Sequence, residues 1–397
     1  MKTLFEDLRS DANLFAAWRH VRRSALNSSN NEIKGYAAEF EHQHQRHIKR
    51  IARKLREQSF KFDPVKGVLK DKRKRLAQGK EPRPIAIATI NNRVVQRALL
   101  QVLQPRTARD ERDPNTKYEP VEDPRLGQLN KVSRSPYGVG GLMYPYGGVR
   151  PAIEMIMSAM SKGARYYYQS DIKAFFTKIP TGTIVDKVKA ETGDASLSEL
   201  FSAALEVDLS NKDELLSYAR LFPSGGIGVA QGSSLSALAG NILLYDFDHK
   251  LNEMGVPAVR YIDDVLIVAN SDAALADAIA YSEGQLGAFG FSLYQPVPGS
   301  DKASKGECRN AFNFLGCTLQ PNRCVPSNKS VATLIKDVSE TISASKRCIG
   351  EFVRAGGRID YTQSRSDVLY KLGKRLFGWQ KAYSFCTDQQ VFFKCRQ

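Results

Sequence analysis

The sequence predicts an α+β fold, in which helical regions at both ends flank a central part where strands and helices alternate. Apolar residues recur at helical spacing near both ends, as in residues 48–55 and 331–338. Short runs rich in aromatic and β-branched residues, such as 166–168 and 265–268, separate helical patterns between about residues 151 and 320. We therefore expect a central sheet that is covered by helices on one face.

The first part of the chain, residues 1–58, has helical periodicity. Its expected core anchors are Trp18, Val21, Phe40 and Ile48. Apolar residues within 47–56 fall at i, i+3 and i+7, which leaves the basic residues of this segment on the opposite helix face. That basic face can meet phosphates or only solvent.

The next part, residues 59–104, should contain a strand near Phe60 and Phe62, a basic loop at 70–75, a strand at 85–88 and a helix through 94–103. We expect the basic loop to contact a phosphate backbone because it lacks apolar periodicity. Residues 105–150 are rich in Pro, Gly and charge, and they predict a long loop with a few turns.

The last part is helical again, from about residue 328 to 393, and a further strand is expected at 293–295. The residues expected at core spacing in the helices are Val331, Leu334, Ile335, Val338, Leu369, Leu372, Leu376 and Trp379.

The composition points to a polyanionic partner. Fifty-eight Lys and Arg against 42 Asp and Glu give a formal net charge of +16, which suits nucleic acid. No apolar run approaches the roughly 20 residues that span a bilayer, and the N-terminus lacks a signal segment. Six cysteines show no zinc-ribbon spacing. We expect a cytoplasmic protein with reduced thiols and no membrane partner.

The most informative segment is Tyr261, Ile262, Asp263 and Asp264, followed by the apolar run 265–268. This pattern predicts two short strands joined by a tight acidic turn. Adjacent carboxylates beside apolar residues repel each other and need a cation. The candidates are a divalent metal ion, which binds through oxygen, or the bases Arg260, Lys302 and Lys305. The alternative is an ordinary Asp-Asp turn that closes a hairpin.

A third carboxylate favours the metal. Asp171 ends an aromatic strand pattern at residues 166–171, as the acidic turn follows another strand. Between the two, a glycine-rich loop at 225–232 leads into a small-residue helix that contains Ser236 and Asn241.

The order of these segments resembles that of the reverse transcriptases. The resemblance covers about residues 60–316, from the segments 82–85 and 93–100 to Phe314, Leu315 and Gly316 at the place of the primer grip. It implies a right-hand polymerase fold with an N-terminal helical region (1–58), fingers (59–150), a palm with an antiparallel sheet (151–320) and a helical thumb (321–397).

Within that family the chain looks like bacterial members, namely group II intron, retron and defence-associated enzymes. Residues 135–138 and the pair Gly378 and Trp379 resemble elements of the intron type. Intron enzymes usually carry proline where this chain has Ala237, and no endonuclease extension follows Gln397. We therefore expect a stand-alone enzyme of antiphage defence that copies an associated structured non-coding RNA, with a retron or group II intron-type enzyme as the alternative.

The resemblance also implies the chemistry, which is nucleotidyl transfer from deoxynucleoside triphosphates to a DNA primer on an RNA template. By resemblance Asp171 and Asp263 bridge two Mg²⁺ ions, Asp264 assists, and the carbonyl of Ile172 completes one ion's ligands. Mn²⁺ could replace Mg²⁺, since it accepts the same oxygen ligands.

The expected nucleotide contacts are Lys80, Arg83, Phe175, Gln231, Gly232 and Lys302. Arg83, then Lys80, would bind the triphosphate, and Phe175 or its neighbour Phe176 would exclude a 2′ hydroxyl. Lys302 or its rival Lys305 would assist departure of pyrophosphate.

Two other functions fit part of the pattern. An RNA-dependent RNA polymerase shares the palm carboxylates but usually has Gly before the paired aspartates. It also has a small residue at the position of Phe175 and Phe176. A catalytically silent RNA-binding protein is disfavoured by the intact Asp171, Asp263 and Asp264.

Overall fold

The computed structural model describes residues 2–108, 118–300, 302–356 and 360–387. Four helices open the chain: α1 (Leu4–Leu8), α2 (Asp11–Leu26), α3 (Asn31–His42) and α4 (His44–Arg56). Helices α1, α2 and α3 pack with α6 (Ile90–Leu103), and α4 packs against α2 and α3. All four expected anchors, Trp18, Val21, Phe40 and Ile48, are buried, and α4 turns its bases outward as predicted.

The fingers segment is a two-stranded antiparallel sheet of β1 (Lys66–Lys70) and β2 (Arg83–Ile87), joined through the short helix α5 (Lys72–Leu76). The strand expected near Phe60 and Phe62 is absent, and those two rings instead pack edge to face. The basic cluster at 70–75 was expected as a loop. Instead, Lys70 ends strand β1, and the cluster is helical from Lys72 onward.

The long connection contains the strand pair β3 (Arg106–Ala108) and β4 (Tyr118–Pro120), the 3₁₀ turn η1 (Pro124–Leu126) and α7 (Leu129–Val132). The strand pair was not expected in this segment, where the sequence predicted a loop with a few turns, and residues 109–117 of it lie outside the described residues.

The central sheet has four antiparallel strands in the order β6-β7-β5-β8. The strands are β5 (Tyr166–Asp171), β6 (Ala258–Tyr261), β7 (Asp264–Ala269) and β8 (Ala303–Glu307). The helices of this part are α8 (Val149–Ser161), α9 (Phe175–Lys178), α10 (Thr181–Thr192), α11 (Ala195–Leu205), α12 (Lys212–Leu215), η2 (Leu216–Leu221), α13 (Ser236–Glu253) and α14 (Asp272–Ala288). Residues 293–295 form no strand, and only Leu293 makes an isolated bridge, to Ile172.

The antiparallel α+β arrangement is as predicted, but helices lie on both faces of the sheet. Val265 and Ile267 belong to the large core that includes α13 and α14, whereas Leu266 and Val268 pack in a second cluster with α8. A strand covered on both faces has a continuous apolar run, and residues 265–269 are all buried.

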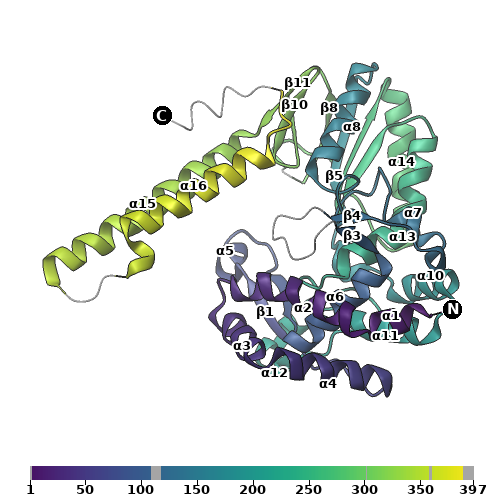
Figure 1. Cartoon of the computed structure of the whole chain (residues 1–397). Helices are drawn as coiled ribbons and strands as arrows, with labels where there is room; N and C mark the ends of the chain where they lie inside the picture. Colours follow the sequence, from purple (N-terminus) through teal and green to yellow (C-terminus); the bar gives the residue numbers. More distant parts are fainter. Residues whose placement is uncertain (1, 109–117, 301, 357–359, 388–397) are drawn as a thin grey trace.

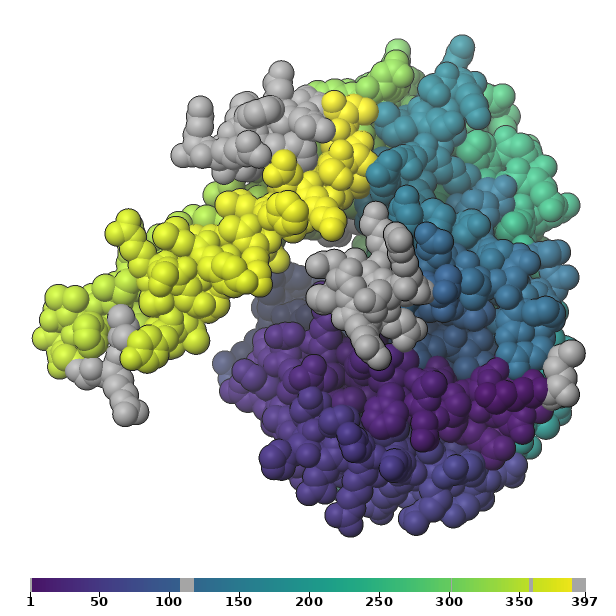
Figure 2. Space-filling view, in the orientation of Figure 1, coloured from purple at the N-terminus to yellow at the C-terminus, as the bar shows by residue number. Residues whose placement is uncertain are grey.

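After β8 the chain forms a small antiparallel sheet of β9 (Phe312–Phe314), β10 (Cys317–Gln320) and β11 (Arg323–Pro326). The helices α15 (Asn328–Ala355) and α16 (Arg365–Ala382), with the turn η3 (Tyr361–Gln363) before α16, then project from the body as a pair (Figures 1 and 2). Leu334 is buried, but Ile335 and Leu369, expected in a core, are 56% and 60% exposed, because the pair packs mainly on itself.

Candidate active site

The acidic turn is a β-hairpin between β6 and β7. Tyr261 pairs with Asp264, so Ile262 and Asp263 are the two central residues of the turn. Ile262 has φ +63°, as the mirror-image turns of tight hairpins require, although this is a costly conformation for a β-branched residue. The N–H of Ile172 donates to the Asp263 carbonyl at 2.7 Å and holds the turn against the end of β5.

Asp171 lies directly across from Asp264 in the β5–β7 ladder. Side chains of directly opposed residues emerge on the same face, with Cα atoms about 4.5–5.5 Å apart. The adjacent Asp263 sits in the turn at the end of that ladder. Asp171 and Asp264 therefore lie beside each other and Asp263 is adjacent in the turn, but among the described residues the carboxylate oxygens of these three aspartates do not all lie within 4.8 Å of one another.

The charges of the turn are poorly compensated. Burial, and then the neighbouring Asp264 carboxylate, raise the pKa of Asp263, and Arg83 and Arg260 only partly oppose this. Burial also raises the pKa of Asp264. Carboxylate oxygens are the hard ligands that Mg²⁺ prefers, so the three aspartates are residues of the type that holds a divalent ion, and their side chains must converge to share one.

Lys302 contacts this cluster. Its Nζ forms an ion pair with Asp171 Oδ2, and the Asp171 N–H donates to the Lys302 carbonyl at 3.0 Å. Burial and the positive charges of Arg83 and Lys80 lower the pKa of Lys302.

Its rival Lys305 lies elsewhere. Lys305 pairs with Tyr168 along the β5–β8 ladder, three positions from Asp171, and its Nζ lies 2.7 Å from Asp272 Oδ1. The geometry favours Lys302 as the lysine of the site.

The fingers approach the site through the glycine loop. The Ala86 N–H donates to the Gln231 carbonyl at 3.2 Å. Gly232 has φ +112°, and a Cβ there would lie 3.4 Å from the Ala86 carbonyl, which explains the glycine. Exposed Arg83 begins the same strand as Ala86, so this contact places its charge near the aspartates.

The structure contradicts the assignment of Phe175 to the nucleotide sugar. Its ring is 2% exposed and packs against Phe291, and a Cβ on Gly240 would meet the ring at 2.7 Å. Ala174, with φ +54°, directly precedes the short helix α9, which begins with these two phenylalanines. Phe176 is the half-buried ring of the pair.

A buried ion pair positions the turn, and the sequence analysis missed it. The Arg260 guanidinium binds Asp248 through two hydrogen bonds of 2.9 and 2.6 Å, and it also donates to Asn241 Oδ1. A further N–H donates to the Ile262 carbonyl at 2.9 Å. Arg260 was considered above as a counter-ion for the aspartates, but its charge is balanced mainly by Asp248. In the sequence, this ion pair was indicated by Arg260 alone, a charged residue within the apolar strand β6.

The segment 135–138 completes this support. Ser135 Oγ accepts from the N–H groups of Tyr137 and Gly138, and the Arg260 N–H donates to the Tyr137 carbonyl. A Cβ on Gly138 would lie 2.5 Å from Asp248 Oδ2, so only glycine fits beside the ion pair.

The predicted primer-grip residues form the turn between β9 and β10. Leu315 and Gly316 have φ +47° and +80°, and Phe314 is 1% exposed. A Cβ on Gly316 would lie 2.7 Å from the Tyr383 hydroxyl, so the turn abuts the end of α16.

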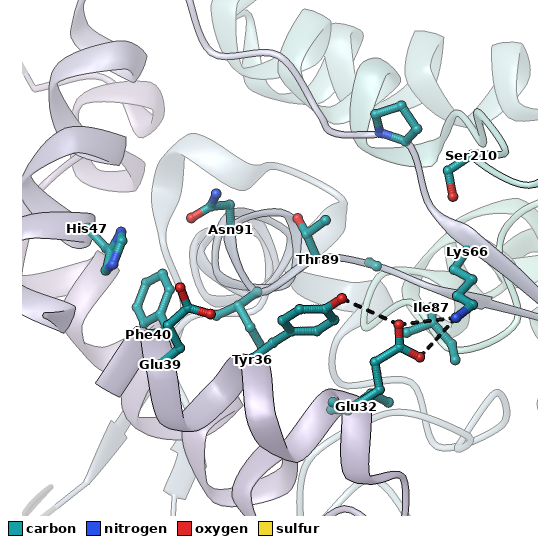
Figure 3. A pocket seen from close by; sticks show the side chains of 14 residues that line it. Glu32, Tyr36, Glu39, Phe40, His47, Lys66, Ile87, Thr89, Asn91 and Ser210 are labelled. Carbon is teal, nitrogen blue, oxygen red and sulfur yellow. Dashed lines mark hydrogen bonds and ion pairs between the residues drawn. The ribbon is translucent and has the colours of Figure 1, made fainter. Parts of the chain in front are cut away.

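A separate pocket of about 410 Å³ opens between α3, the end of β2 and the start of α6 (Figure 3). Glu32 lies within it and binds Lys66 Nζ at 3.0 Å. None of the predicted site residues lines this pocket, so it is distinct from the acidic cluster.

These features define a nucleotidyl-transfer polymerase with fingers, palm and helical thumb. The sequence profile of the family described as "Reverse transcriptase (RNA-dependent DNA polymerase)" matches residues 68–319, more than half of the chain. The chain belongs to this family.

Solved structures similar to the chain include a "Partial Cas6-RT-Cas1--Cas2 complex" and a "Cas6-RT-Cas1--Cas2 complex", each at 19% identity and TM-score 0.37 over 72% of this chain. The chain spans 42% and 26% of the length of those proteins. Telomerase from Candida albicans matches at 13% identity and TM-score 0.40, over 83% of this chain and 54% of that protein. None of the curated proteins compared matches the chain. Among the described residues, no helix has the length and hydrophobicity that a membrane crossing requires.

Proposed function

We propose that the chain extends a DNA primer on an RNA template by two-metal nucleotidyl transfer, with Asp171, Asp263 and Asp264 holding the ions. The observation that carries this is the direct pairing of Asp171 with Asp264 beside the turn that contains Asp263. Burial raises the pKa values of Asp263 and Asp264, so both carboxylates would gain from a bound cation.

When Mg²⁺ is bound, it stabilises the attacking 3′ oxygen and the departing oxygen of the triphosphate. The carbonyl of Ile172 is a further candidate ligand. The Ile172 N–H donates to the Asp263 carbonyl, so this residue lies directly beside the acidic turn. Mn²⁺ suits the same oxygen ligands.

The remaining residues bind the nucleotide. Arg83 and Lys80 supply the positive charge that binds the triphosphate. Both lie near enough to Lys302 to lower its pKa. Lys302 holds the proton that pyrophosphate takes on departure. Phe176 replaces Phe175 as the ring beneath the sugar, since it is the less buried of the two.

The loop residues Gln231 and Gly232 line the nucleotide from the palm side, where they already contact the finger strand. Phe314, Leu315 and Gly316 hold the primer end. The open space between the α15–α16 pair and the N-terminal helices, visible in Figure 2, offers room for a template and primer.

Primer extension on a homopolymeric RNA template tests the activity. We expect incorporation of deoxynucleotides but not ribonucleotides, dependence on Mg²⁺ or Mn²⁺, and no product from the Asp263→Asn variant. Equal incorporation of ribonucleotides would favour an RNA-dependent RNA polymerase. Full activity of Asp263→Asn would refute the proposed site.

We further propose that the template is a dedicated structured RNA and that the role is antiphage defence. A second observation supports an RNA partner: the outward face of α4 forms a hollow lined by Arg46, Lys49, Arg50, Arg53 and Arg56. Sequencing of copurifying RNA and DNA tests the idea. A single enriched RNA with matching complementary DNA is expected, and random cellular RNA alone would contradict it.

A further inference from the structure

Three cysteines that are distant in the sequence meet at the base of the helical pair. Cys317 begins β10, Cys324 lies in β11, and Cys386 follows α16. All three are at most 4% exposed, and their sulfur atoms all lie within 4.8 Å of one another. None of the three belongs to the candidate active site around Asp171, Asp263 and Asp264.

The strand register explains the convergence of two of them. Leu319 pairs with Cys324, and Cys317 lies two residues before Leu319, so both cysteines emerge on one face of the hairpin as diagonal neighbours. Cys386 reaches the same face from the end of α16, and its N–H donates to the Tyr383 carbonyl at 3.0 Å.

The spacing of the sulfur atoms fits a tetrahedral metal. Two thiolates bound to Zn²⁺ at about 2.3 Å lie about 3.8 Å apart at the tetrahedral angle, and the Cys324 and Cys386 sulfurs are 3.7 Å apart. In a disulfide the two sulfur atoms would be bonded at about 2.05 Å. The cluster is also purely sulfur, and soft thiolates select zinc over Mg²⁺.

Hydrogen bonds tie Cys324 to Thr387, the residue that follows Cys386. The Cys324 N–H donates to Thr387 Oγ1 at 2.8 Å, and the Thr387 N–H donates to the Cys324 carbonyl at 3.0 Å. Outer contacts of this kind orient ligands before a metal arrives.

We propose that Cys317, Cys324 and Cys386 bind one zinc ion as thiolates, which leaves a fourth position for a small ligand. The three thiols release their protons on binding. The site joins the C-terminal end of α16 to the β10–β11 hairpin, whose first strand directly follows the turn of Leu315 and Gly316. It therefore fixes the base of the helical pair relative to that turn.

The test uses the full-length protein purified without chelator and with reductant. We expect about one zinc per chain by elemental analysis. Cobalt exchanged into the protein should give thiolate-to-metal charge-transfer absorption, which Mg²⁺ sites cannot give. Chelation of the zinc should lower the melting temperature.

Variants locate the ligands. Cys317→Ser, Cys324→Ser and Cys386→Ser should each lose the zinc, whereas Cys308→Ser, which removes another buried thiol outside the cluster, should keep it. Asp263→Asn should also keep the zinc, which separates this site from the proposed catalytic one. If a cluster variant fails to fold, the zinc content and cobalt spectrum of the unmutated protein still decide.

Two results would overturn the proposal. One is metal-free protein with all six thiols titratable after purification in zinc-supplemented buffer. The other is a Cys324–Cys386 disulfide with no bound metal under reducing conditions.

Discussion

Arg260 and Asp248 form an ion pair that is almost completely buried, with side-chain exposures of 1% and 4%. Arg260 also donates to the Ile262 carbonyl in the acidic turn. The pair thus joins helix α13 to the turn that carries Asp263. Desolvation raises the pKa of Asp248, and Arg260 opposes this shift, so each charge depends on the other.

The first prediction concerns this pair. Arg260→Met or Asp248→Leu alone should destabilise the protein by about 3–5 kcal/mol, because each leaves one buried charge unpaired. The double variant should recover most of that loss, since apolar side chains can replace a buried pair. Denaturant unfolding of the four proteins measures this.

The double variant should nevertheless remain a poor polymerase, because the Ile262 carbonyl has lost its Arg260 donor. Primer extension in the stability-recovered protein separates the positioning role from folding. Wild-type activity in the double variant would show that Arg260 only stabilises the fold.

The second prediction concerns Asp263→Asn. Without metal, we expect a melting temperature equal to or above that of the wild type, because the substitution removes a buried charge that Asp264 repels. Activity should fall at least about 10³-fold, which corresponds to about 4 kcal/mol. Mg²⁺ should raise the melting temperature of the wild type more than that of the variant. A sharply lower melting temperature in metal-free buffer would contradict this reasoning.

The acidic turn and Asp171 could be predicted because each follows a strand pattern, and local patterns specify hairpins. The Arg260–Asp248 pair could not, since it depends on how α13 packs against β6. The choice between Phe175 and Phe176 depended on which ring packs against Phe291 and Gly240, which composition does not reveal. Long-range packing of α16 brought Cys386 to Cys324, so cysteine spacing alone did not predict a cluster.

The third prediction concerns pH. The raised pKa values of Asp263 and Asp264 mean that the metal-free fold binds more protons than the unfolded chain at mildly acidic pH. Their contribution to the free energy of unfolding should therefore rise as pH falls through the raised pKa values and be lost as pH rises. Asp263→Asn should flatten this dependence.

Because Mg²⁺ competes with those protons, the Mg²⁺ concentration for half-maximal activity should increase as pH falls, by up to about tenfold per unit for each proton displaced. Titration of activity with Mg²⁺ at several pH values measures the effect. A midpoint independent of pH down to the ordinary range of Asp would contradict the assignment.

The fourth prediction separates the two phenylalanines. Phe175→Ala should destabilise the fold by about 3–5 kcal/mol, as loss of a buried ring does. Phe176→Ala should instead weaken discrimination against ribonucleotides by about 10–200-fold. This is the usual change in substrate discrimination when a pocket gains or loses one small group. Competition between dGTP and GTP in primer extension compares them. Unchanged discrimination in Phe176→Ala would remove that ring from the sugar site.

The last prediction compares Lys302 and Lys305. Lys302→Gln should lower the rate of nucleotide addition by about 10²–10⁴-fold, the usual contribution of a general acid. Lys305→Gln removes a partly exposed ion pair with Asp272, which is worth about 1 kcal/mol or less, and should leave the rate unchanged.

The pH profile shows whether Lys302 donates the proton. An acid acts while protonated, so the wild-type rate should fall as pH rises through the Lys302 pKa, which burial holds below the ordinary lysine value. Lys302→Gln should lack this decline, because the titrating group is gone. If the variant keeps the decline and loses only affinity for Mg²⁺ or nucleotide, Lys302 serves through its ion pair with Asp171 and does not supply the proton.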